Sequence, residues 1–250
     1  MQPANAQPPG AAGSPAAEEI LQDGCDVPDS GFAATLEAID RWTGFCEFAA
    51  RSGPAGAILA DPPLGFKTWS TKGEGRSPQH HYACPTFEQL TALPVRDLAA
   101  AHSWLFLWVP LRSAPSVEPL MNAWGFRFSG SAFVWSKLNP NGPGFAFGGG
   151  FTTRKNVEVC WVGRRGKPRR NAKDVRELII ARRRQHSRKP DEVYRRIERF
   201  CDGPYVELFA RQRWPGWLAW GDQVDSFTAA AQVGLFDSPA QSPVIVESCA

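Results

Sequence analysis

Two kinds of hydrophobic pattern alternate along the chain. Apolar runs, typical of strands buried in a sheet, occur at residues 57–60, 102–109, 126–137, 156–163 and 205–209. Helical spacing or a capping residue predicts helices at residues 32–48, 86–93, 115–124 and 190–200. Strands that alternate with helices predict an α/β fold, a three-layer sandwich around a mostly parallel sheet.

The two ends of the chain depart from this pattern. Residues 1–30 are rich in Ala, Pro, Gly and Gln and show no apolar period, which predicts a disordered N-terminal tail. Residues 228–250 are polar and rich in Ala, Pro and Ser, which predicts a flexible C-terminal tail. The segment between them, residues 31–227, is expected to form one domain.

The run at 57–60 ends directly in Asp61, which is followed by Pro62 and Pro63. A carboxylate at the carboxyl end of a buried parallel strand lies where open α/β sheets bind ligands. The prolines end the ladder, and their carbonyls are available as acceptors. Asp61 and the Pro62 carbonyl would suit the two hydrogens of an exocyclic amine on a base, with its lone pair directed toward a methyl donor. An ordinary Asp-Pro turn at a strand end is the alternative.

Positive charge is concentrated in one block. Residues 164–199 contain 15 Lys and Arg against 5 Asp and Glu, a net charge of +10 in a chain whose total is +3. Such a block predicts a polyanionic partner, with a solvated helix face as the alternative.

Two long segments separate the predicted elements. Residues 65–83 follow Asp61 as a polar loop, and structureless loops of this length in compact domains are usually functional. Residues 139–150 are glycine-rich but lack the Lys and the Ser or Thr of a phosphate-binding loop, so we do not interpret them as a nucleotide cradle.

Cysteine usage and hydropathy bear on the compartment. The six cysteines are scattered without a Cys-x-x-Cys pair, which argues against a zinc site and a disulfide framework and fits a reducing cytosol. The sequence contains no apolar run of 18 residues and no signal peptide. A soluble cytoplasmic protein that holds no metal is therefore expected.

Several motifs occur together in one order: Asp61-Pro62-Pro63, Phe106 to Val109, Trp135-Ser136-Lys137, His186 to Pro190, Glu207 to Arg211 and Trp220 to Gln223. They resemble the N6-adenine methyltransferases with the Asp-Pro-Pro-Trp motif. The eukaryotic members of that family modify messenger RNA, and its bacterial and phage members modify DNA. The resemblance extends over residues 54–226.

The resemblance implies a Rossmann-like domain that uses S-adenosyl-L-methionine. It places the catalytic motif at Asp61, Pro62, Pro63 and Leu64. It places cofactor contacts at Asp61, Lys189, Glu207, Arg211, Asp222 and Gln223. Within that set Lys189 would meet the cofactor carboxylate, a role that suits a flexible ammonium, and Arg211 and Gln223 would lie around the ribose. The expected nucleic-acid contacts are Lys67, Tyr82, Lys137, Arg182, Arg183 and Arg184, of which Tyr82 would contact the target nucleoside.

Three features depart from the family pattern. Leu64 stands where active members have an aromatic residue, and stacking of a base on an aromatic ring is worth about 1–3 kcal/mol. Asp222 replaces the usual Asn before Gln223, and an acid can still accept from a ribose hydroxyl. No acidic residue ahead of Asp61 matches a position that would meet the cofactor adenine, and that contact is unassigned.

The leading interpretation is a DNA adenine N6-methyltransferase of bacterial or phage type, whose target base leaves the stack to reach Asp61. The compact, Arg-rich form favours DNA over RNA. A catalytically weak or inactive homologue that binds nucleic acid is the alternative that Leu64 favours. Methylation of the cytosine N4 amine, which has the same geometry, and a basic binding domain without catalysis are the others.

A short motif follows the predicted domain. The segment from Gln232 to Phe236 resembles the Gln-aliphatic-x-Leu-Phe peptide with which bacterial DNA enzymes bind the replication sliding clamp. Leu235 and Phe236 would then be the apolar anchors of a peptide in a groove. The alternative is that both side chains pack back onto the domain.

Overall fold

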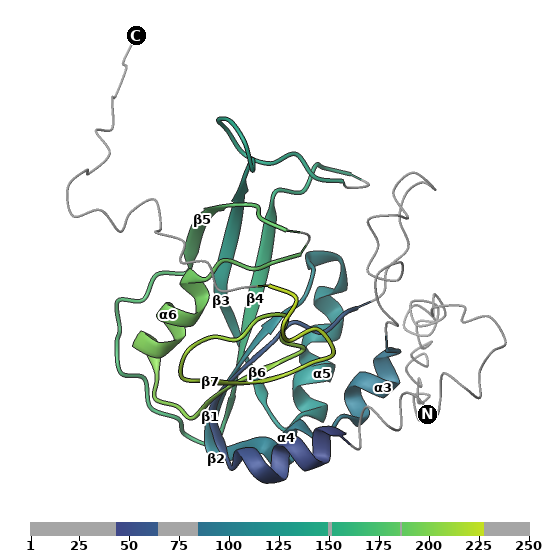
Figure 1. Cartoon of the computed structure of the whole chain (residues 1–250), viewed down its shortest axis with the longest axis vertical. Helices are drawn as coiled ribbons and strands as arrows, with labels where there is room; N and C mark the ends of the chain where they lie inside the picture. The colour runs from purple at the N-terminus through teal and green to yellow at the C-terminus, as the bar shows by residue number, and fades with distance from the viewer. Residues whose placement is uncertain (1–43, 65–84, 150–151, 186, 228–250) are drawn as a thin grey trace, which may run out of the picture.

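The computed structural model describes residues 44–64, 85–149, 152–185 and 187–227. These residues form a seven-stranded sheet in the order β5-β3-β4-β2-β1-β6-β7 (Figure 1). Its strands are β1 (Ala55–Ala60), β2 (Ala99–Trp108), β3 (Arg127–Leu138), β4 (Val157–Arg165), β5 (Leu178–Arg182), β6 (Tyr205–Leu208) and β7 (Trp217–Trp220). The helices are α3 (Phe87–Ala92), α4 (Val95–Leu98), η3 (Leu111–Ser116), α5 (Val117–Ala123) and α6 (Glu192–Phe200), and residues 44–52 are also helical. The expected α/β fold with a mostly parallel sheet is confirmed.

Strand direction brings the ends of six strands to one edge of the sheet. β1 pairs in parallel with β2 and β6, β6 with β7, and β3 with β5. β4 is antiparallel to both of its neighbours, β2 and β3. β4 therefore begins at the edge where the other six strands end. We call this edge, which contains Asp61, the carboxyl edge.

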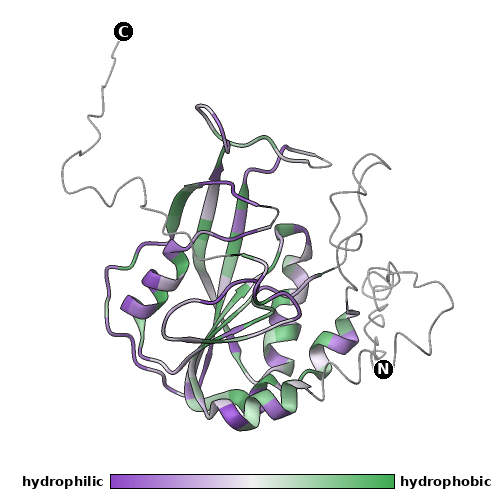
Figure 2. Ribbon diagram, in the orientation of Figure 1, coloured by the Kyte–Doolittle hydropathy of each residue, from purple (hydrophilic) through white to green (hydrophobic). Residues whose placement is uncertain are grey.

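Helices cover both faces of the sheet, since α6 lies on the face opposite α3 and α5 (Figure 1). The alternation of side chains along a strand supplies a separate core to each face. On β1, Ile58 and Ala60 join the core under the helices α3 to α5, whereas Ala57 and Leu59 join the core under α6. β1 is accordingly apolar along its length, and many of the polar residues lie on helices and loops (Figure 2).

Local sequence signals account for several helix ends. The Thr86 hydroxyl accepts from Gln89 N, and the Gln89 side chain accepts from Thr86 N, which completes a capping box at the start of α3. Gly125 has a φ of +85° directly after the last turn of α5, a conformation that ends a helix. The predicted helix 115–124 begins inside the 3₁₀ helix η3, which contains Pro115, and continues as α5.

Two strands of the sheet lie outside the runs that the sequence predicts as strands. Residues 217–220 form β7. β5 was not predicted, because its five residues lie inside the basic block and end in Arg182.

Some predictions fall outside the described residues and remain predictions. They concern residues 1–43, the loop with Lys67 and Tyr82, and the tail with Gln232, Leu235 and Phe236. Within the described ranges, no helix is long and apolar enough to cross a membrane.

Candidate active site

Asp61 follows the last residue of β1 at the centre of the carboxyl edge, between β2 and β6. The Asp61 amide still donates to the Leu208 carbonyl at 3.4 Å, so the ladder to β6 ends at this residue. The next turn is closed by Leu64 N, which donates to the Pro62 carbonyl at 2.9 Å. That carbonyl keeps a second lone pair for another donor. The half-buried Leu64 side chain packs against the core under α3 to α5.

Four charged side chains form a chain of ion pairs at this edge. Lys189 Nζ donates to Asp61 Oδ2 at 2.6 Å and lies 3.5 Å from Glu158 Oε2. Glu158 Oε1 also accepts from Lys137 Nζ, and the Lys189 ammonium lies 5.5 Å from the centre of the Trp108 ring. The cluster therefore runs from Asp61 after β1, through Lys189, to Glu158 on β4 and Lys137 on β3.

Burial and pairing set the protonation of this cluster. Burial raises the pKa of Asp61, and the Lys189 ammonium offsets that effect only in part. Burial would raise the pKa of Glu158 too, but Lys189 and Lys137 together bring it below its usual value. For Lys189, burial favours the neutral amine, yet Asp61 and Glu158 raise the pKa above its usual value. The ammonium thus stays charged. Of the two carboxylates, Asp61 has a pKa raised above its usual value, whereas the pKa of Glu158 is lowered.

A second carboxyl group, Glu207, lies on the strand beside Asp61. Glu207 on β6 pairs with Leu59 on β1, and Leu59 lies two residues before Asp61. Burial raises the pKa of Glu207 to about 8, and the nearby Asp61 charge acts in the same direction. Tyr194 Oη donates to Glu207 Oε2 at 2.8 Å. Near neutral pH Glu207 is therefore mostly protonated.

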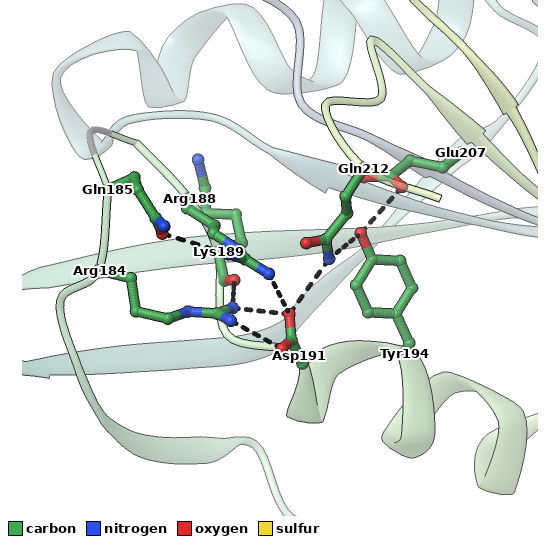
Figure 3. A network of polar contacts seen from close by, with 8 residues as sticks. All are labelled: Arg184, Gln185, Arg188, Lys189, Asp191, Tyr194, Glu207 and Gln212. Carbon is green, nitrogen blue, oxygen red and sulfur yellow. Dashed lines mark hydrogen bonds and ion pairs between the residues drawn. The ribbon is translucent and has the colours of Figure 1, made fainter. Parts of the chain in front are cut away.

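Figure 3 shows the polar network that extends from Glu207 to the segment before α6. Gln212 Nε2 donates to Tyr194 Oη and to Asp191 Oδ1, both at 3.1 Å. Asp191 is bound by two nitrogens of Arg184, at 2.6 and 2.7 Å, and Arg188 lies 4.0 Å from it. Arg184 also donates to the Lys189 carbonyl at 2.7 Å. The network thereby ties the backbone of Lys189 to α6 and to β6.

Arg211 and the segment 220–223 lie together beyond the ends of β6 and β7. Ala210 N donates to the Trp220 carbonyl at 2.9 Å. A Cβ on Gly221 would come within 2.7 Å of Ala210 backbone atoms, so only glycine allows this approach. The backbones that carry Arg211, Asp222 and Gln223, which are expected to bind the cofactor, are thus brought side by side. The Arg211 guanidinium lies 4.4 Å from the centre of the Phe227 ring.

The residues expected to contact nucleic acid are placed differently from one another. Lys137 is half-buried and paired with Glu158. Arg182 Nη1 donates to the carbonyls of Asn139 and Gly142, and Arg183 is exposed. Arg184 does not lie on an outer surface with them, because its guanidinium is directed inward to Asp191.

The sequence analysis missed Glu158, Asp191, Tyr194, Gln212 and Trp108. A signal existed for Glu158, a carboxylate at the second position of the otherwise apolar first seven residues of β4. Asp191 precedes α6 in sequence, yet its side chain caps no amide of that helix. Trp108 Nε1 and Gln212 Oε1 are buried and have no hydrogen-bond partner among the described residues. No local sequence signal marks these last residues.

The described residues contain no group of three or more His, Cys, Asp or Glu side chains arranged to hold a metal ion. The cysteines at 46, 160 and 201 are free thiols.

Comparisons with known proteins give one consistent result. A model of the MT-A70 family matches residues 56–223. The type II methyltransferase M.MunI of a Mycoplasma species is 30% identical over 185 residues, which cover 67% of this chain and 76% of that protein. The human N(6)-adenine-specific methyltransferase METTL4 is 32% identical over 187 residues, covering 68% of this chain and 37% of METTL4. Human METTL3, the catalytic subunit of an N(6)-adenosine-methyltransferase, is 30% identical over 178 residues, covering 69% of this chain and 29% of METTL3. The chain therefore spans three quarters of the Mycoplasma protein but well under half of either human protein.

Proposed function

This chain belongs to the MT-A70 family of N6-adenine methyltransferases, and from that premise we propose that it transfers a methyl group from S-adenosyl-L-methionine to the N6 amine of adenine in DNA. The observation that carries the proposal is Asp61, a carboxylate of raised pKa beside the Pro62 carbonyl at the end of a central strand. Both are acceptors, and the target amine has two hydrogens.

The residues at the carboxyl edge fit this cofactor. S-adenosyl-L-methionine supplies an activated methyl group on a sulfonium, and it also carries an ammonium, a carboxylate and ribose hydroxyls. Glu207, whose buried carboxyl group has a pKa of about 8, would ionise beside a cationic group, because an opposite charge favours the charged form. The expected partners of its carboxylate and ribose are Lys189, Arg211, Asp222 and Gln223.

Lys189 needs one qualification drawn from its contacts. Its ammonium has three N–H donors, and it has three acceptors nearby: Asp61, Glu158 and the Ser187 carbonyl at 3.3 Å. Asp61 and the Ser187 carbonyl accept hydrogen bonds from the ammonium, whereas Glu158 Oε2 is an ion-pair partner without a hydrogen bond among the described residues, so the third N–H is the donor that a cofactor carboxylate would take. In the arrangement described, Lys189 positions the Asp61 carboxylate.

The chain's own groups would favour transfer in two ways. Asp61 and the Pro62 carbonyl would accept the two amine hydrogens and hold the nitrogen lone pair in one direction. Because they lie in a partly buried site with little water, these acceptors interact more strongly than they would in solvent. The raised pKa of Asp61 also makes its carboxylate a better acceptor for the proton that the amine loses on methylation.

DNA is proposed as the substrate because a relative of which the chain covers 76% is named a type II methyltransferase and because the chain carries a basic block. A weak or inactive homologue that binds nucleic acid is the second candidate. Leu64 favours it, since this side chain packs against the core and offers no aromatic face to a base.

Asp61 can be tested directly. Purified protein is incubated with labelled S-adenosyl-L-methionine and with DNA or RNA of mixed sequence, and the methylated base is identified by mass spectrometry. Asp61→Asn keeps the side-chain shape but removes the charge, and we expect it to lower turnover more than tenfold, about 1.4 kcal/mol or more of transition-state stabilisation. Asp97→Asn, an exposed acid on α4, is the matched control and should retain wild-type turnover.

Retention of more than about a tenth of the turnover in Asp61→Asn would remove Asp61 from the mechanism. A wild-type protein that is inert on every nucleic acid but still binds DNA would favour the second candidate. Methylation at cytosine N4 or in RNA alone would correct the substrate.

A further inference from the structure

The segment that follows β3 shows an inverted pattern of burial. Phe145 and Phe147 are 54% and 75% exposed, whereas Ala146 between them is only 4% exposed. Small apolar residues are normally left at the surface more readily than phenylalanine, because burying a phenylalanine side chain contributes more free energy. Two exposed rings separated by a buried alanine therefore require an explanation beyond folding.

The two rings are exposed because backbone contacts hold this segment in one conformation. Ala146 N donates to the Lys137 carbonyl at 2.7 Å, and Phe145 forms an antiparallel bridge with Leu138. Arg182 Nη1 holds the carbonyls of Asn139 and Gly142 at 2.9 and 2.8 Å. In this strand-like stretch alternate side chains point to opposite sides, so both phenylalanines point to the same side.

The charge around these rings is positive. The Arg154 guanidinium lies 5.1 Å from the centre of the Phe147 ring. Lys155 is exposed beside it, and residues 139–156 contain no Asp or Glu. Exposed aromatic rings with neighbouring cations are the combination that binds nucleic-acid strands, because bases stack on the rings and phosphates attract the cations.

The position of the rings relative to Asp61 is set by the sheet. β3 runs in the same direction as β1, so the segment after Leu138 leaves the sheet at the carboxyl edge and projects beyond it (Figure 1). The ion pairs that start at Asp61 end at Lys137, whose carbonyl binds Ala146. The two rings thus lie on the same side of the molecule as the proposed reaction centre.

We propose that Phe145 and Phe147 form a stacking platform for unpaired bases of the strand that carries the target adenine. The proposal rests on the proposed function, and it names how that site would hold its substrate. A base that leaves the duplex exposes its neighbours, and each base stacked on a ring compensates for part of the lost stacking. The platform would therefore bind a nucleic-acid strand, and it would recognise the flat face that every base presents.

The test separates base stacking from charge. Binding of the full chain is measured by fluorescence anisotropy to an oligothymidylate of about 15 nucleotides, to an abasic strand of equal length and charge, and to oligouridylate. The wild type should bind the thymidylate about tenfold more tightly than the abasic strand. Phe145→Ser with Phe147→Ser should remove that preference and leave binding to the abasic strand unchanged.

Two further variants control the result. Phe145→Leu with Phe147→Leu keeps an apolar surface without ring faces, and it should also lose the preference. Phe128→Ser removes a phenylalanine that is 40% exposed near the beginning of β3, at the edge opposite the two rings, and it should behave as the wild type. Equal preference for oligouridylate would show that the platform accepts RNA strands as well as DNA strands. Preference for one polymer would identify the kind of strand that the platform binds.

Three outcomes would overturn the platform: no base preference in the wild type, full preference in the serine variant, or a wild-type dimer that the serine variant dissociates in sedimentation. The last would assign the rings to contact between two copies of this chain. Failure of the proposed function would be distinct, since the base preference would persist in a protein that methylates neither DNA nor RNA.

Discussion

The carboxyl group of Glu207 keeps its proton near neutral pH within the candidate site. Burial raises its pKa to about 8, so at pH 7 it is mostly neutral although its ordinary value is 4.5. The hydrogen bond from Tyr194 acts against this shift but does not cancel it. A carboxyl group in this state binds a cation only by giving up its proton.

This state predicts a coupling between cofactor binding and protons. If the cationic part of S-adenosyl-L-methionine lies beside Glu207, binding at pH 7 should release close to one proton. The dissociation constant should fall as the pH rises from 6.5 toward about 8, since less free energy is then needed to ionise Glu207. Calorimetry in buffers with different ionisation enthalpies measures the proton count directly.

Glu207→Gln is the matched control, because glutamine keeps the shape and cannot titrate. Its binding should release no proton at pH 7 and should be independent of pH over the same range. Equal proton release in the variant and the wild type would place the titrating group elsewhere.

Leu64 illustrates the limit of a residue-by-residue reading. The resemblance implies that Leu64 stands where an aromatic residue is expected, and this stays a prediction. It could not show that the side chain packs against the core under α3 to α5, since that depends on the course of the turn closed by Leu64 N and the Pro62 carbonyl.

Among the elements, the segment between β5 and α6 depends most on contacts from elsewhere. Ser187 has a φ of +59°, a conformation that is uncommon for a residue with a Cβ. The bonds of Asp191 to Arg184 and Gln212, and of Arg184 to the Lys189 carbonyl, hold this backbone. Asp191 is 2% exposed and balances the charge of Arg184, with Arg188 also 4.0 Å away.

Asp191→Asn should therefore lower the free energy of unfolding and also impair catalysis. Removing one partner of a buried ion pair costs about 3–5 kcal/mol, and the Lys189 backbone loses its support. The free energy can be measured by urea denaturation and the turnover by methyl transfer. Asp174→Asn removes the exposed pair with Arg199, 68% and 62% exposed, and should change stability by less than about 1 kcal/mol. Equal stability in the two variants would show that the network of Asp191 is dispensable.

The elements also show what the sequence could and could not predict. β1, β2 and β6 carry apolar runs because both of their faces are buried, so their patterns identified these strands and placed Asp61 directly after β1. β5 is too short and too close to arginines to produce a recognisable pattern. The pairs Lys189 with Glu158 and Gln212 with Asp191 join residues far apart in sequence, so their partners follow from the fold and not from local spacing.

For the molecule as a whole, the fold divides the basic block between two edges. β4 runs opposite to the other strands, so the residues after it start at the edge away from Asp61. Contacts confirm this placement, since Lys167 N donates to His102 in the first half of β2 and Trp104, near the middle of that strand, donates to the Arg169 carbonyl. β5 then returns the chain to the carboxyl edge, where Arg183 is exposed. The net charge of the block therefore does not describe a single binding face.

This division predicts which cations bind the DNA backbone. Replacing Arg154, Lys155 and Arg183 by glutamine removes three exposed charges at the carboxyl edge. Replacing Arg169, Arg170 and Lys173 by glutamine removes three exposed charges associated with the opposite edge. Both variants change the net charge from +3 to 0, so any difference between them reflects position.

Each phosphate contact contributes about −0.9 to the slope of log affinity against log salt concentration. We expect the first variant to flatten that slope by about 2 to 3 and the second by less than about 1, measured by anisotropy with duplex DNA at several salt concentrations. Equal slopes in the two variants would mean that DNA is attracted by the total charge of the molecule and not by the edge at which Asp61 lies.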